Sequence, residues 1–248
     1  GLILVFLIAP AVVVIPMSFS SAPYLTFPPP GLSLRWYQAY FSSTEWMRAT
    51  LTSFKVAVLS TLLSVALGTL GALGLVRSQF RGKRLVYILI LMPMVVPVII
   101  VSISMYSLYV TFGLVGTTLG MILAHTLLAV PYVVVNVSAV LAGFDRRLEH
   151  AAMSLGANRW TSLIKVTIPL IKPGIFSGAL FAFITSFDEL VVTMFICGIS
   201  NTTLPKKMFD GIRFEVSPTI SAVSTMLISF AAVLLYMNSR RKADEGPH

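Results

Sequence analysis

Long apolar runs dominate the pattern of hydrophobic and polar positions along the chain. Five complete runs reach or exceed the ~18 to 20 residues that a helix needs to cross ~30 Å of hydrocarbon, and a sixth run at the start is about that long. The pattern predicts an all-α polytopic membrane protein with six transmembrane helices, forming one domain over residues 1–248. The predicted spans cover about 1–20, 50–76, 86–110, 118–141, 175–197 and 218–237.

Composition agrees with this class. The chain is 56% hydrophobic and only 11% charged, whereas ordinary globular domains are about 25% charged. An ordinary soluble domain is therefore excluded. The single cysteine, Cys197, cannot form an internal disulfide and gives no information on the redox compartment.

The first predicted span begins without a methionine and without a basic segment before it. We therefore expect the natural N-terminus to precede Gly1. A cleaved signal peptide is the alternative. Pro10 and Pro16 within the run, and the lack of an A-x-A-like site at its end, disfavour that alternative.

The net charge of +9 is compatible with nucleic-acid binding, but the positions of the charges indicate a membrane topology instead. When loops are assigned alternately to two sides, one side holds six Lys and Arg residues and the other holds twelve. Basic residues accumulate on the cytoplasmic side of membrane proteins, so we expect both termini in the cytoplasm, contact with lipid and no nucleic-acid partner. The twelve are Arg77, Arg81, Lys83, Arg84, Arg146, Arg147, Arg159, Lys165, Lys172, Arg240, Arg241 and Lys242.

Prolines mark three candidate helix breaks. Pro93 and Pro97 lie four residues apart in one span, and Pro131 lies in the next. Each removes a backbone hydrogen bond from its helix. Two interpretations remain open: the breaks line a cavity or act as hinges, or they are simple kinks filled by neighbouring side chains.

The inner segment of about 142–172 is long for a plain connection. Asp145 is placed to cap a short helix running to Leu155, and Gly156 to end that helix in a left-handed conformation. Asn158 is placed to cap a second short helix. The sequence predicts a helix, turn and helix that protrude into the cytoplasm.

The predicted helix, turn and helix offer a surface on which a partner protein can dock. Ala151 and Ala152 leave room for a partner to pack closely, and Glu149 supplies a charge beside them. Without a partner, the segment would have little to bury itself against.

The same segment resembles the cytoplasmic loop of permease subunits of bacterial ABC importers. Their signature is E-A-A, three residues, Gly, nine residues, then I-x-L-P. Here it stands as His150-Ala151-Ala152, Gly156 and Val166-Thr167-Ile168-Pro169, with every spacing kept. Val166 for Ile and Ile168 for Leu are conservative departures. His150 replaces the usual Glu, and Glu149 is a candidate to take over its contact.

The resemblance extends over most of residues 33–228 and favours the spermidine/putrescine-type branch, specifically its second permease. It implies a type I ABC importer permease fold in the bacterial cytoplasmic (inner) membrane. The implied partners are a homologous second permease, two cytoplasmic ATPase subunits and an external solute-binding protein. The short helix after Arg147 would be the coupling helix, which seats in a groove of the ATPase. The resembling stretches are "SLRWYQAYF", "FRGK", "PMVVPVII", "AHTLLAVPYVVV", "GALFAFITSFDELVV" and "TLPKKMFDGIRFEVSPTISAVSTMLI".

The sequence lacks three common motifs of nucleotide-binding and catalytic sites. It contains no G-x-x-x-x-G-K-[ST] loop, HExxH or GxSxG, so we expect a transport subunit without catalytic residues, metal ligands or a cofactor of its own. ATP and Mg²⁺ would bind to the partner ATPase. An ion-coupled secondary transporter, which would also place acids in a span, is the rival from another class.

The stretch "AFITSFDELVVTMF", residues 182–195, places two adjacent acids in an apolar run. Side chains ~100° apart on a helix cannot face one direction equally, so we expect either Asp188 or Glu189 to face the pathway and the other to face a neighbouring helix or loop. An ion pair with the partner permease or with Arg213 is the structural alternative. Further pathway candidates, because polar residues are costly in a span, are Tyr132, Asn136, Thr185 and Ser186.

Other polar residues of the later spans have a simpler interpretation. Hydrogen bonding between helices explains His125, Asn136 and Ser138 better than solute contact does. The acids favour a cationic or amine-bearing solute, in agreement with the polyamine-type resemblance. Relatives of similar sequence are also linked to opines, aminophosphonates, ferric iron and amino-acid derivatives, so these remain open.

Overall fold

The computed structural model describes residues 2–199, 201–214 and 217–244, and helices are the regular elements of this part of the chain. The described residues fall into two compact units, divided between Ala49 and Thr50 and again between Lys206 and Lys207, with both ends of the chain in the first unit. The predicted all-α class is confirmed. A single transmembrane domain remains a prediction.

The first unit contains α1 (Leu2–Ser18), α2 (Arg35–Ser42) and α12 (Thr219–Asp244), together with most of α11 (Leu204–Phe214). α12 packs against both α1 and α2. The segment between α1 and α2 is attached to α2 by one hydrogen bond: the indole N–H of Trp36 donates to the carbonyl of Ser20 at 2.8 Å.

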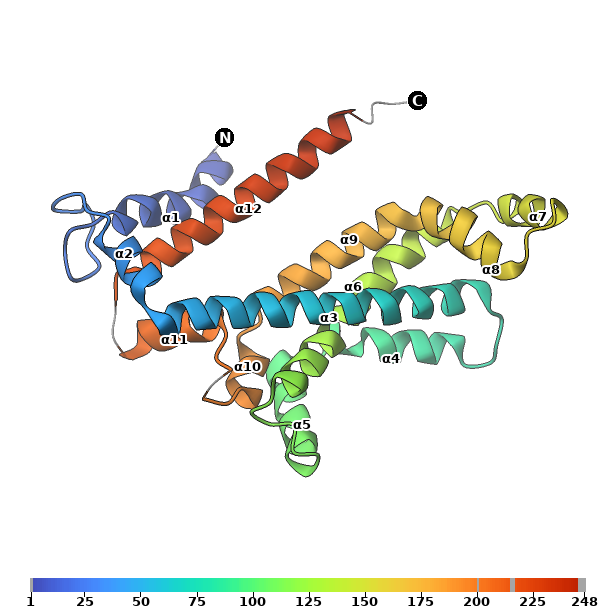
Figure 1. Cartoon of the computed structure of the whole chain (residues 1–248), viewed down its shortest axis with the longest axis horizontal. Helices are drawn as coiled ribbons and strands as arrows, with labels where there is room; N and C mark the ends of the chain where they lie inside the picture. The colour runs from blue at the N-terminus through green and yellow to red at the C-terminus, as the bar shows by residue number, and fades with distance from the viewer. Residues whose placement is uncertain (1, 200, 215–216, 245–248) are drawn as a thin grey trace. The chain divides into compact units, whose positions relative to one another are not determined.

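The second unit contains the remaining helices, with α3 entering it from the first unit and α11 leaving it. Figure 1 shows α6 and α9 side by side, with α7 at one end of this pair and α10 at the other. The helices are α3 (Thr44–Arg77), α4 (Lys83–Val95), α5 (Val98–Thr111), α6 (Thr118–Ala142), α7 (Arg147–Ser154), α8 (Arg159–Ser162), a π-helix (Leu163–Thr167), α9 (Ile168–Phe187), α10 (Val191–Ile196) and α11 (Leu204–Phe214).

Three helical segments of the described chain are long and apolar enough to cross a membrane: α3, α6 and the run from Arg159 to Phe187. The bent pair α4 and α5 makes a fourth if it is counted as one span. α1, with 17 residues, and the apolar part of α12, Thr219–Ala232, are shorter. By length and composition the structure therefore supports up to four of the six predicted spans.

A straight helix over the expected span 86–110 is not observed. α4 and α5 replace it, and they are bent by 104° at the break between them. Pro97 explains the break, because proline has no N–H to donate and disfavours helical backbone at the residue before it. Val96 accordingly has extended backbone, with φ −71° and ψ 134°.

The other two prolines do not break their helices. Pro93 lies inside α4 and Pro131 inside α6, so the helix continues through both of these candidate breaks, and a kink filled by neighbouring side chains remains the open interpretation. Pro131 is buried. Packing of neighbouring helices around it compensates for the one hydrogen bond that proline removes.

The expected span over 175–197 is divided as well. α9 begins at Ile168, earlier than predicted, and ends at Phe187. Residues 188–190 are not helical, and α10 follows from Val191. We call residues 188–190 the acidic break, because they contain both acids of this span.

α6 and α9 approach each other very closely. A Cβ added to Gly178 of α9 would lie 2.9 Å from the Cα of Val133 on α6, and one added to Gly174 would lie 3.0 Å from the carbonyl oxygen of Asn136. Small residues at such contacts let two helix backbones meet. The two glycines therefore set the distance between α6 and α9.

Two apolar clusters surround this pair. One joins α3, α6 and α9 through residues such as Leu73, Val137 and Ile171. The other joins α3, α5, α6 and α10 through residues such as Val56, Met121 and Ile196. α6 contributes to both clusters and is the central helix of this unit.

We predict that Gly178→Ala lowers thermal stability in detergent, because its new methyl group would overlap the α6 backbone. Overpacking of this kind costs about 1 to 3 kcal/mol. Gly74→Ala is the matched control, since no atom lies within 4 Å of a Cβ at this position of α3. Alanine there should be neutral or stabilising by up to about 1 kcal/mol. Equal melting temperatures for the two variants would contradict the close approach.

Candidate functional site

The two acids of the acidic break, Asp188 and Glu189, lie in different surroundings. Glu189 is half-buried, and its Oε1 accepts a hydrogen bond of 2.9 Å from the backbone N–H of Val192, in the first turn of α10. Asp188 is exposed, and its backbone N–H closes the last turn of α9 by donating to the carbonyl of Ile184 at 3.0 Å. Glu189 therefore stabilises the start of a helix, whereas Asp188 is exposed.

A buried histidine joins the two sides of the acidic break. Nδ1 of His125 lies 2.9 Å from Oγ of Ser186 in the last turn of α9, and Nε2 lies 3.3 Å from Oγ1 of Thr193 in α10. His125 is 1% exposed. Since the imidazole bonds to residues before and after the break, it holds α9 and α10 in a fixed arrangement.

Two further contacts extend this network. Ser60 of α3 donates to Oγ of Ser186 at 2.8 Å, and Oγ1 of Thr193 donates to the carbonyl of Glu189 at 3.0 Å. These side chains are buried. Side chains of α3, α6, α9 and α10 thus meet in one hydrogen-bonded cluster beside the acidic break. This agrees with the expected role of His125 in bonding helices together.

Of the predicted pathway residues, Ser186 belongs to this network. Thr185, the residue before Ser186 in the sequence, is half-buried. The other two lie farther along the α6–α9 pair. Nδ2 of Asn136 donates to the carbonyl of Tyr132 at 2.8 Å, within its own helix. Asn136 packs at Gly174, fourteen residues before Asp188, or roughly 20 Å along a helix.

Tyr132 belongs to a separate aromatic contact. Its ring stacks on Phe181 with the centroids 6.3 Å apart. Phe181 precedes Asp188 by about two helical turns. The structure therefore does not gather Tyr132 and Asn136 with the acids, and a pathway role for these residues remains a prediction.

The connection between α6 and α9, residues 143–167, has the predicted turn chemistry. Oδ1 of Asp145 accepts from the N–H of Arg147 at 2.9 Å, at the start of α7. Gly156 has a φ of 91°, which confirms its left-handed conformation after this helix. Oδ1 of Asn158 accepts from the N–H of Thr161 at 2.7 Å and caps α8 as expected. α7 ends at Ser154, one residue before the predicted end.

Glu149 of α7 is engaged within the chain. Its carboxylate accepts from the guanidinium of Arg77, at the end of α3, and from the hydroxyl of Thr167. Only 16% of the Glu149 side chain is exposed. His150 beside it is exposed. The substitution of Glu149 for the usual acid in a partner contact remains a prediction, although its carboxylate is already paired.

Pro169 occupies the first turn of α9, directly after the π-helix. Proline cannot donate the backbone hydrogen bond of a regular helix. The preceding turn is wider, with the N–H of Ile168 bonded to the carbonyl of Leu163. This wider turn carries Thr167, which is fully buried where it meets Glu149.

Exposed apolar side chains on the α6–α9 connection were not predicted as functional residues. Leu155 is 90% exposed and Trp160 is 72% exposed, and Leu148 and Met153 are exposed beside them. No residue of α7 is buried. The signal in the sequence was the presence of large apolar residues on both sides of Gly156, in a segment otherwise rich in polar residues. Such a patch is typical of a protein contact surface.

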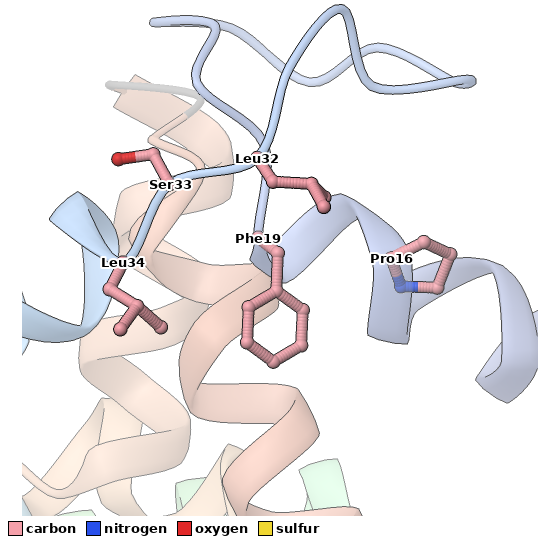
Figure 2. Close-up of a pocket in the computed structure, with 5 residues that line it drawn as sticks. All are labelled: Pro16, Phe19, Leu32, Ser33 and Leu34. Atoms are coloured by element: carbon pink, nitrogen blue, oxygen red, sulfur yellow. The ribbon is translucent and has the colours of Figure 1, made fainter.

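A separate hollow lies in the first unit, beside α1 and α2. Its volume is about 550 Å³, and it is lined by Pro16, Phe19, Leu32, Ser33 and Leu34. In Figure 2 the hydroxyl of Ser33 points away from Phe19 and Pro16. No charged side chain lines it, so it offers nothing to a cation. The described residues also hold no group of three His, Cys, Asp or Glu side chains suited to a metal ion.

Comparison with known proteins gives consistent matches. The family model described as "Binding-protein-dependent transport system inner membrane component" matches residues 64–241. The chain is 32% identical over 234 residues to the spermidine/putrescine transport system permease protein PotC of Haemophilus influenzae, covering 94% of this chain and 90% of that protein. It is 35% identical over 236 residues to the putrescine transport system permease protein PotI of Escherichia coli K12, covering 92% and 84%.

A solved structure has the same fold. It is described as the crystal structure of a bacterial ABC transporter involved in the import of the acidic polysaccharide alginate. It matches with a TM-score of 0.75 at 18% sequence identity, over 97% of this chain and 92% of that one. The type of fold expected from the inner loop is therefore confirmed.

We predict that His125→Phe loosens the acidic break. Phenylalanine fills the space but removes the imidazole bonds of Ser186 and Thr193, which keep only Ser60 and the Glu189 carbonyl as partners, and a buried polar group left unsatisfied costs about 1 to 3 kcal/mol. Amide hydrogen exchange should speed up in residues 188–196 and remain unchanged in α7. His150→Phe, at an exposed position, is the control and should leave residues 188–196 unaffected. Unchanged exchange in His125→Phe would contradict the role of this histidine.

Proposed function

Because the chain belongs to the family of binding-protein-dependent transport system inner membrane components, we propose that it forms half of the pathway for a polyamine such as spermidine or putrescine. The observation that carries the choice of solute is the exposed carboxylate of Asp188 at the acidic break. The high coverage of the polyamine permease relatives supports it.

The family confirms several expectations from the sequence. Its members are permease subunits of ABC importers, so this chain is a transport subunit and not an enzyme. It is a multi-pass component of the inner membrane, in a family whose transport depends on a binding protein. The rival interpretation as an ion-coupled secondary transporter falls away.

Asp188 is the acid that we assign to the solute. An exposed acid can exchange water for the ammonium group of a polyamine. Glu189 is half-buried and one of its carboxylate oxygens is already bonded to Val192 at the start of α10, so it is less available to the solute. Since ion pairs with good geometry discriminate by charge, a single carboxylate would favour amines over neutral solutes.

We assign docking of the ATPase to the exposed residues of the α6–α9 connection. His150, Ala151, Leu155 and Trp160 are exposed there, and their burial in a groove of the ATPase would supply the apolar contact that this connection lacks. ATP and Mg²⁺ would bind to the ATPase subunits, and no cofactor to this chain.

Transport would follow from the arrangement of the α6–α9 pair. The connection that meets the ATPase joins one end of this pair, and the acidic break follows the other end of α9. Closure of two ATPase subunits would move the connection, and a rigid helix pair would carry this movement to the acidic break. A homologous second permease would form the other half of the pathway, and both termini of this chain would lie in the cytoplasm.

We predict that Asp188→Asn raises the KM for ATP-driven polyamine uptake about tenfold, because loss of one charge-assisted contact costs roughly 1.5 kcal/mol. Uptake is measured in proteoliposomes with the complete complex and its binding protein. Glu189→Gln is the matched comparison, since an amide oxygen can still accept from Val192. This variant should keep its KM within about twofold, given that such a difference is under 0.5 kcal/mol.

A normal KM in Asp188→Asn together with a raised KM in Glu189→Gln would reverse the assignment of the two acids. Normal uptake by both variants would remove the acidic break from the solute pathway. If the wild-type complex imports no amine from a polyamine panel, the proposed solute class is wrong.

We predict that Gly156→Val abolishes solute-stimulated ATP hydrolysis while the protein still inserts into the membrane. A β-branched residue at a φ of 91° is strained by about 1 to 3 kcal/mol, and relief of this strain would reorient α7 and Leu155. Gly82→Val is a closely matched control. Gly82 has a φ of 90° and open surroundings, but it lies in the turn before α4. Normal stimulated hydrolysis in Gly156→Val would exclude the coupling role.

A further inference from the structure

We propose that Arg77, Glu149 and Thr167 form a polar link that makes α7 and the end of α3 move as one body during coupling. This inference rests on the proposed function, because it needs an ATPase that acts on α7. It assigns to Arg77 a positioning role at the opposite end of the second unit from the acidic break.

The link joins three segments that are far apart in sequence. The guanidinium of Arg77, the last residue of α3, donates from Nη2 to Oε1 of Glu149 and, at 3.1 Å, to Oγ1 of Thr167. The hydroxyl of Thr167 in turn donates to the same carboxylate. Each member contacts the other two, so the triad fixes α7 against both α3 and the π-helix.

Its partial burial makes the link stronger than a surface ion pair. The Arg77 and Glu149 side chains are 29% and 16% exposed, and Thr167 is fully buried. Charges that are shielded from water interact more strongly and are screened less by salt. A fixed hydroxyl that bonds to both charges also defines their geometry.

α7 has few other means of attachment. None of its residues is buried, so apolar packing within this chain does not hold it. A second, longer hydrogen bond also joins the start of α7 to the end of α3: Nη2 of Arg146 donates to the carbonyl of Val76 at 3.4 Å. The two connections therefore involve Val76 and Arg77, the last two residues of α3.

α3 continues from this link to the acidic break. Its Ser60 bonds to Ser186 in the network of His125. Ser60 precedes Arg77 by seventeen residues, which is about 25 Å along a helix. The triad therefore gives a force on α7 a second route to the acidic break, through α3 as well as through the α6–α9 pair.

The triad is tested with Arg77→Gln, and Arg81→Gln is the control because Arg81 is an exposed arginine in the following turn. Spin labels at Gly74→Cys on α3 and Ser154→Cys on α7, in a Cys197→Ser background, report the distance between these helices. The complete complex is measured without nucleotide and after trapping with ATP and vanadate. Polyamine uptake per ATP hydrolysed is measured on the unlabelled variants.

With Arg77 present, and equally in Arg81→Gln, we expect one narrow distance that is the same in both states. In Arg77→Gln the distance should broaden or shift on trapping, and uptake per ATP should fall at least tenfold. Thr167→Val, an isosteric change without loss of charge, should broaden the distance to a smaller extent. It also provides the test if Arg77→Gln fails to assemble.

Two results would overturn the proposal. One is a wild-type distance that changes between the two states, and the other is Arg77→Gln with normal uptake per ATP. The distance measurement needs ATP but no solute. A wild-type complex that keeps the distance fixed but imports no polyamine would therefore refute the proposed solute and leave the rigid link intact.

Discussion

Close packing between α6 and α9 is the constraint on which the rest of the second unit depends. Gly174 and Gly178 bring the α9 backbone against Asn136 and Val133 of α6, so closely that even one added methyl group would overlap α6. One end of the pair continues into the connection that carries α7, and α9 leads at its other end into the acidic break. Because cores packed to this density transmit strain instead of absorbing it, the pair can act as a lever between these two places.

The acidic break shows how a polar interruption is stabilised inside an apolar protein. A helix that stops within a membrane leaves backbone groups that lipid cannot satisfy, so the protein must satisfy them itself. Here Glu189 bonds to the first turn of α10, and His125 bonds to Ser186 and Thr193 on the two sides. With the interruption satisfied in this way, Asp188 remains exposed, and we propose that its carboxylate binds a cation.

Local sequence signals predicted much of this fold and only part of the site. Run lengths predicted the all-α class, and Gly156 and Asn158 specified their turn correctly, because each of these two turn signals acts within a few residues. The break at Pro97 and the continuity through Pro131 look alike in sequence, because tertiary packing decides whether a helix survives a proline. Likewise, neither the bond between Glu149 and Arg77 nor the bridge of His125 across the break follows from spacing, since each joins segments brought together only by folding.

Together these features support our proposal of a permease in which the solute meets Asp188 while Glu189 and His125 hold the helices around it. The most direct test is a structure of the complete importer with spermidine trapped in transit. We predict that a spermidine nitrogen lies within about 4 Å of the Asp188 carboxylate, the distance of an ion pair, with Glu189 still bonded to Val192. Spermidine bound elsewhere in the pathway, with Asp188 facing lipid or paired with the second permease, would contradict this assignment.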